Sequence, residues 1–93
     1  MHIVFGMVDD KDINHVLDML PKDAIFYFTQ ANTKRAINGT VVKTLAAEHG
    51  LDGACYPSVY EAYKAALQAA NPEDFIFVGG SSYLVGDFLK NCI

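Results

Sequence analysis

The sequence has little of what several protein classes require. Two cysteines, Cys55 and Cys92, are too few for a disulfide framework. Seven basic residues stand against eleven acidic ones, a net charge of −4, so the chain lacks the basic surface that nucleic-acid binding uses. The longest apolar runs, 24–28 and 75–78, are far below the roughly 18 residues of a membrane span, and no secretion signal is visible. We therefore expect a cytoplasmic protein that binds neither nucleic acid nor membrane.

Several catalytic and binding motifs are also missing. There is no G-x-x-x-x-G-K-[ST] loop for a triphosphate and no G-x-G-x-x-G turn for a dinucleotide. Ser81 does not belong to a G-x-S-x-G nucleophile elbow, because residue 83 is tyrosine. The histidines and cysteines have no metal-ligand spacing. We expect no metal site and no catalytic residue in this chain.

The 93 residues leave room for a single domain, 1–93, and 52% of them are hydrophobic, which argues against disorder. Short apolar runs predict four strands, at 3–8, 24–29, 54–56 and 75–78, and helical spacing of apolar residues follows each of them. The expected helix N-caps are Asp12, Thr40, Ser58 (with Glu61 in a capping box) and Ser81 or Ser82. The expected helix stops are Pro21, Gly50 and Asn71-Pro72. The residues expected to face the core are Ile13, Val16, Leu17 and Leu20; Val42, Leu45, Ala46 and His49; Val59, Ala62, Tyr63, Ala66, Leu67 and Ala70; and Leu84, Val85, Phe88 and Leu89.

Strands without polar alternation are buried on both faces, and a helix after each strand indicates a parallel sheet covered by helices. The fold class predicted is therefore α/β: a three-layer Rossmann-like domain of four mostly parallel strands alternating with four helices. The strand order expected is 3-2-1-4.

Ligands of an open parallel sheet bind beyond the carboxyl ends of its strands. Four segments meet that description: 8–12, 29–38, 56–58 and 79–83. The second is roughly ten residues long, where such a loop normally takes about 2–6, and it carries Lys34 and Arg35. Together they predict a polar ligand-binding edge.

Each candidate on this edge has a structural and a functional interpretation. Asp10 and Asp12 suit a helix start, while Lys11 between them could face a carboxylate or phosphate. Arg35 is either a solvated charge or a planar fork for a carboxylate. The turn 79–81 is either a tight connection or an approach for an anion to a helix N-terminus, and Tyr83 either packs or presents its hydroxyl.

Two of these segments resemble a known family. Residues 6–12, G-M-V-D-D-K-D, are similar to the G-M-x-x-D-K-D segment of folylpolyglutamate synthases and bifunctional dihydrofolate synthases. Residues 80–86, G-S-S-Y-L-V-G, are similar to their G-S-x-Y-L-V-G segment. Residues 33–36, T-K-R-A, resemble their T-P-R-A loop with Lys34 in place of proline, and 58–66 resembles the helix between. The resemblance covers nearly the whole chain in the right order.

The resemblance implies a fragment of an ATP-dependent amide ligase of the Mur ligase superfamily: most of its C-terminal domain, without that domain's first segment and without the N-terminal ATPase domain. In such an enzyme ATP, with Mg²⁺, phosphorylates a folate carboxylate, and the amino group of L-glutamate then displaces phosphate. The expected partners are folate, glutamate and the missing N-terminal domain. ATP and Mg²⁺ are expected to need the full-length parent, and the isolated fragment is expected to be inactive.

The resemblance also implies roles for single residues. Ser81 matches a serine near the glutamate site, and Gly80 lets the backbone come close. Arg35 matches a loop arginine that could face a substrate carboxylate. Substrate binding is also expected of Lys11 and Tyr83, and nucleotide binding of Asp10 and Asp12.

Two other functions are compatible with the same fold class. A receiver domain is disfavoured, because Pro57 follows the third strand where a receiver has its acceptor aspartate, and 79–81 has no lysine. A free-standing α/β module that binds a small anionic ligand stays open as the alternative.

Overall fold

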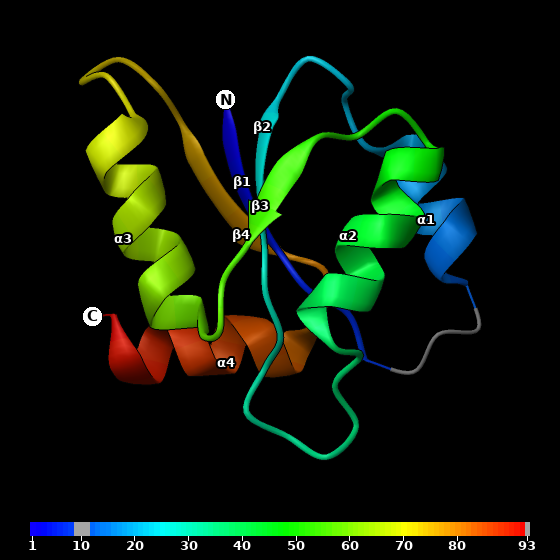
Figure 1. The fold of residues 1–93 in the computed structure, drawn as a ribbon. Helices are drawn as coiled ribbons and strands as arrows, with labels where there is room; N and C mark the ends of the chain where they lie inside the picture. The colour runs from blue at the N-terminus through cyan, green and yellow to red at the C-terminus, as the bar shows by residue number, and fades with distance from the viewer. Residues whose placement is uncertain (9–11, 93) are drawn as a thin grey trace.

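The computed structural model describes residues 1–8 and 12–92 (Figure 1). Strands and helices alternate along the chain, in the order β1 (His2–Phe5), α1 (Ile13–Met19), β2 (Ile25–Phe28), α2 (Gly39–Glu48), β3 (Gly53–Cys55), α3 (Val59–Ala69), β4 (Ile76–Gly79) and α4 (Ser82–Asn91). All strands pair in parallel in one sheet of order β3-β2-β1-β4. This confirms the predicted fold class and strand order.

The sheet lies between α1 and α2 on one side and α3 on the other (Figure 1), with a hydrophobic cluster on each face. Ile3, Phe5, Phe26 and Phe28 of β1 and β2 pack with α1 and α2 on one face, where the rings of Phe26 and Phe28 stack at 5.5 Å. On the other face Val4 and Tyr27 pack against Ala62 and Ala66 of α3. A smaller cluster joins α3 to α4 through Val59, Leu84 and Phe88. The central strands are therefore covered on both faces, as their uninterrupted apolar runs predict.

Two expected caps are confirmed. The Ser58 hydroxyl accepts a hydrogen bond from the Glu61 amide at 3.2 Å, and the Ser81 hydroxyl accepts one from the Leu84 amide at 3.1 Å. Each satisfies one of the amides that a helix leaves open at its start.

The expected cap at Thr40 is wrong. α2 begins earlier, and its N-cap is Asn38, whose side-chain oxygen accepts from the Thr40 amide at 2.8 Å. The preceding loop favours this start, because the Gly39 amide donates to Gln30 Oε1 at 2.8 Å. Asp12 is the residue before α1, as expected, but its side chain makes no capping hydrogen bond.

The C-terminus of α2 ends as expected at Gly50, which has a φ of +77°. The Gly50 amide donates to the Ala47 carbonyl and the Leu51 amide donates to the Ala46 carbonyl, a Schellman arrangement. Leu51 is buried beside Ala46, so the turn also carries the chain into the core.

Several expectations about strand ends and burial are wrong at the margins of the sheet. β1 stops at Phe5 rather than residue 8, because Met7 and Val8 contact the long loop instead: the Met7 carbonyl accepts from the Ile37 amide, and Val8 bridges to Ala36. Phe77 of the fourth strand is 57% exposed and the preceding Phe75 is 76% exposed. Other residues expected to be buried are also exposed: Ile25, Ala54, Leu67 and Leu89. β4 is an edge strand, so only part of its surface lies under helices.

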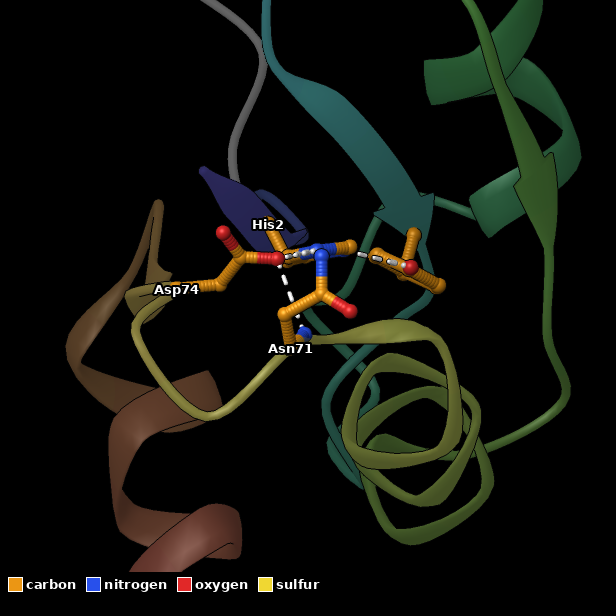
Figure 2. A network of polar contacts seen from close by, with 4 residues as sticks. His2, Asn71 and Asp74 are labelled. Carbon is orange, nitrogen blue, oxygen red and sulfur yellow. Dashed lines mark hydrogen bonds and ion pairs between the residues drawn. The ribbon is translucent and has the colours of Figure 1, made fainter.

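Polar contacts link the strands near the start of β1 (Figure 2). His2 is 3% exposed; its Nδ1 lies 2.8 Å from the Tyr27 hydroxyl and its Nε2 lies 3.2 Å from Asp74 Oδ2. The backbone amide of Asn71 also donates to Asp74, at 2.9 Å, and this bond, followed by the one to His2, lowers the pKa of the Asp74 carboxyl. Burial, and then the nearby Tyr56, raises the pKa of Tyr27. The network joins β1, β2 and the turn before β4 at the end of the sheet opposite the candidate site.

No helix in the described part of the chain is long and apolar enough to cross a membrane.

Candidate functional site

The carboxyl ends of β1 and β4 mark the point where the strand order changes direction. β2 and β3 lie on one side of β1, and β4 lies on the other. Open α/β sheets bind ligands at such points. Gly80 has a φ of +112°, and a Cβ there would collide with the Gly6 carbonyl oxygen. A Cβ on Gly6 would lie only 2.6 Å from the Thr29 carbonyl oxygen. Glycine at these positions therefore lets three chain segments meet at this edge.

The N-terminus of α4 opens at the same place. Ser81 precedes the helix in extended conformation, and its hydroxyl oxygen accepts from the Leu84 amide. The hydroxyl proton is not used in that bond, so Ser81 keeps a donor for a ligand. A helix start carries partial positive charge, which favours an anionic group. The cap and a ligand contact by Ser81 are thus compatible.

The long loop 29–38 folds back over the end of β1. The Ile37 amide donates to the Met7 carbonyl at 2.8 Å, and Ala36 forms an isolated antiparallel bridge with Val8. Within the loop the Ala36 amide donates to the Thr33 carbonyl at 3.1 Å. These contacts fix the backbone that carries Lys34 and Arg35.

Arg35 reaches from this loop to the first turn of α4. Its Nη1 donates to the Tyr83 hydroxyl at 3.3 Å, and its guanidinium carbon lies 5.7 Å from the centre of the Tyr83 ring. Both side chains are exposed. A guanidinium held against a ring beside a helix start can bind a carboxylate in a bidentate way.

The structure thus places four of the seven predicted site residues at one edge: Gly80, Ser81, Tyr83 and Arg35. Asp12 lies at the start of α1. Lys11 and Asp10 lie outside the described residues. The assignment of ligand contacts to these seven residues stays a prediction.

A cleft of about 550 Å³ lies beside this edge, between the ends of β2 and β3 and the outer turns of α4. Its polar lining side chains are Gln30, Asn32, Ser58, Tyr60, Asp87 and Asn91. The Asn32 amide donates to Asp87 Oδ2, which ties the long loop to α4. Gln30 bridges two segments, donating to the Pro57 carbonyl at 2.6 Å and accepting from the Gly39 amide.

Sequence reasoning singled out none of the individual cleft residues as a ligand contact. Gln30 and Asn32 lie in the loop 29–38, whose predicted ligand contacts are at its two basic residues, Lys34 and Arg35. Asp87 and Asn91 are four residues apart and therefore share one face of α4. That polar spacing was the available signal, and it was hidden because the apolar stripe through Leu84 and Phe88 dominates the pattern.

Among the described residues no group of three or more His, Cys, Asp or Glu side chains is arranged to hold a metal ion.

Comparison with known proteins gives a consistent answer. No family model matches the chain, and no curated protein sequence matches it. Among solved structures, bifunctional folylpolyglutamate synthase/dihydrofolate synthase from Yersinia pestis CO92 matches 98% of the chain with a TM-score of 0.82 and 26% identity. The chain has the fold of a folylpolyglutamate synthase domain. The family resemblance indicated by the two sequence segments is therefore confirmed.

Two further solved structures share the fold at lower identity. E. coli FolC in complex with DHPP and ADP matches 97% of the chain with a TM-score of 0.73 and 24% identity. Mycobacterium tuberculosis folylpolyglutamate synthase complexed with ADP and AMPPCP matches 96% with a TM-score of 0.74 and 20% identity. In each comparison the chain spans 22% of the matched chain. A Y. pestis structure of the synthase is complexed with AMPPNP and Mn ion.

Proposed function

We propose that the chain is the C-terminal substrate-binding and closure domain, or most of it, of an ATP-dependent folylpolyglutamate or dihydrofolate synthase. The parent enzyme is a cytoplasmic ligase that joins L-glutamate to a folate carboxylate through an acyl phosphate. The observation that carries the proposal is the synthase fold over 98% of the chain, combined with Arg35 and Ser81 at the same sheet edge.

The geometry of this edge suits a small dicarboxylate. Glutamate presents two carboxylates and one amino group, and only the amino group reacts. In the proposed arrangement, Arg35 and the start of α4 with Ser81 hold carboxylate groups, and Tyr83 keeps the guanidinium in place. Fixing both carboxylates orients the amino group toward the acyl phosphate, which converts a bimolecular encounter into a positioned one.

The remaining parts of the reaction are proposed to lie on the parent chain. The proposal assigns phosphate binding and Mg²⁺ to the N-terminal ATPase domain, while Asp10, Lys11 and Asp12 approach the nucleotide or substrate from this domain. Closure of the two domains then excludes water, which would otherwise hydrolyse the acyl phosphate. The isolated chain supplies orientation alone and is expected to be inactive.

The proposal is tested by glutamate kinetics in the full-length parent. We expect Arg35→Ala to raise the KM for glutamate by about tenfold or more, because loss of a charged hydrogen bond costs about 1.5–3 kcal/mol. Lys34→Ala is the matched control: Lys34 is the neighbouring exposed cation on the same loop, and its loss should leave the KM within about twofold. Equal effects of the two substitutions would contradict the assignment of Arg35.

The alternative, a free-standing module for a small anion, is distinguished by the natural gene product. Its intact mass, together with the sequence upstream of His2, shows whether a P-loop domain precedes this one. A longer product with such a domain supports the synthase. A natural product of 93 residues would overturn the synthase proposal and favour the anion-binding module.

A further inference from the structure

The loop 29–38 contacts α4 at two points that lie one helical turn apart (Figure 1). Near the start of α4, the guanidinium of Arg35 contacts the hydroxyl and the ring of Tyr83. One turn further on, the half-buried carboxylate of Asp87 accepts a hydrogen bond from the backbone amide of Asn32. Residues four apart share one face of a helix, so a single face of α4 holds both points of the loop.

The contact between Arg35 and Tyr83 is too weak to hold the loop by itself. Both side chains are exposed, and the contacts of an exposed cation are worth little in water. Ordering the long arginine side chain also costs conformational entropy. A hydrogen bond to an ionised carboxylate is about twice as strong as one between neutral groups. The Asn32 amide belongs to the backbone, so its bond to Asp87 fixes the chain rather than one side chain.

The other contacts of the loop hold its two ends. Ala31 is buried in the cluster that joins α3 to α4, and the Ile37 amide donates to the Met7 carbonyl. Between these ends, the Thr33 amide donates to the Ala31 carbonyl and the Ala36 amide donates to the Thr33 carbonyl. Both of these bonds lie within the loop, so they shape it without attaching it to α4. The bond to the carboxylate on α4 therefore attaches the middle of the loop.

We propose that Asp87 is a positioning residue for Arg35: through the Asn32 amide it holds the loop where the guanidinium stands beside the start of α4. The inference rests on the proposed function, in which Arg35 binds a carboxylate of glutamate. Without the acceptor at Asp87, residues 32–35 gain conformations in which the guanidinium lies away from the helix start. Glutamate then has to select among them, which costs binding free energy. The expected consequence is weaker glutamate binding with little change in the chemical step.

The first experiment follows the loop in the 93-residue chain by nuclear magnetic resonance. We expect nuclear Overhauser contacts between the Arg35 side chain and the Tyr83 ring, and we expect Asp87→Ala to abolish them. Asn91→Ala is the matched control, because Asn91 lies one turn further along the same face and its side chain donates to the Asp87 carbonyl within α4. That substitution should leave the contacts unchanged. An Asp87→Ala chain that keeps them at wild-type strength overturns the inference.

The second experiment is a double-mutant cycle on glutamate kinetics in the full-length parent. We expect Asp87→Ala to raise the KM for glutamate by about fivefold, the effect of one lost hydrogen bond. The kcat should stay within about twofold of the wild-type value. In an Arg35→Ala background, Asp87→Ala should have no further effect, because it acts through Arg35. Equal effects of Asp87→Ala in the two backgrounds would overturn the inference and leave the role of Arg35 intact.

The cycle also separates this inference from the proposed function. If Arg35→Ala leaves the KM unchanged, the proposed function fails. If Arg35→Ala raises the KM and Asp87→Ala does not, the inference fails and the proposed function stands. Asp87→Asn keeps an acceptor oxygen without the charge, so its KM should lie between those of the wild type and Asp87→Ala. A KM above that of Asp87→Ala would contradict the hydrogen bond as the cause.

Discussion

At the scale of single residues, Gly80 is the position at this edge of the sheet where an added side chain is tolerated least. Its φ of +112° disfavours any side chain, and a Cβ would also collide with the Gly6 carbonyl. The strain alone costs about 1–3 kcal/mol, so we expect Gly80→Ala to lower the free energy of unfolding by at least about 2 kcal/mol. Urea denaturation followed by circular dichroism measures it.

Gly86 is the internal control for this prediction. It lies in the exposed middle of α4, and a Cβ there would meet nothing within 4 Å. Gly86→Ala should raise stability by about 0.5–1 kcal/mol, because alanine loses less conformational entropy in a helix. Similar changes in the two variants would show that the positive φ and the close approach to Gly6 do not govern position 80.

At the scale of elements, the predicted and observed N-caps of α2 differ. The sequence predicts Thr40, and the structure has Asn38. The Asn38 side chain accepts from the Thr40 amide, whereas Thr40 is already a residue of α2 and its hydroxyl lies 3.8 Å from Cys55 Sγ. We expect Asn38→Ala to cost about 1 kcal/mol of stability and Thr40→Ala less than about 0.5 kcal/mol. Thermal unfolding of both variants measures the difference, and the reverse order would restore Thr40 as the cap.

Most of the elements follow from local signals in the sequence. The runs around Val4 and Tyr27 are apolar on both faces, and each is buried between helices, so the parallel sheet was predictable. Ser58, Ser81 and Gly50 mark helix ends by their own chemistry. These signals act within a few residues and need no tertiary information.

The errors occur where the outcome depends on distant segments. The run at β4 looks as buried as the others, but β4 is at the edge and no helix covers Phe77. Leu67 and Leu89 belong to the apolar faces of α3 and α4 by their spacing. They lie at the margins of those faces, where neither the sheet nor the neighbouring helix covers them. The contact between Arg35 and Tyr83 depends on how a long loop folds over β1, which side-chain types alone do not specify.

At the scale of the whole molecule, the network at the other end of the sheet ties segments that are far apart in sequence. Asp74, before β4, contacts His2 of β1, and His2 contacts Tyr27 of β2 (Figure 2). Tyr27 in turn packs against Tyr56, which follows β3, with ring centres 5.9 Å apart. Every strand is thus linked directly or through a neighbour to one carboxylate, so the charge of Asp74 matters for the sheet as a unit.

This arrangement predicts how the stability of the chain depends on acid. The Asn71 amide and His2 lower the pKa of Asp74 below its ordinary 3.8, so the unfolded chain takes up this proton at higher pH than the folded chain. The stabilisation is therefore present above pH 3.8 and is lost as the pH falls through the lowered folded-state pKa. In urea titrations at several pH values, Asp74→Asn should weaken the loss of stability at acid pH. Asp52→Asn, at an exposed position between α2 and β3, should retain the wild-type dependence. An Asp74→Asn variant with an unchanged loss of stability at acid pH would assign the pH dependence to other carboxylates.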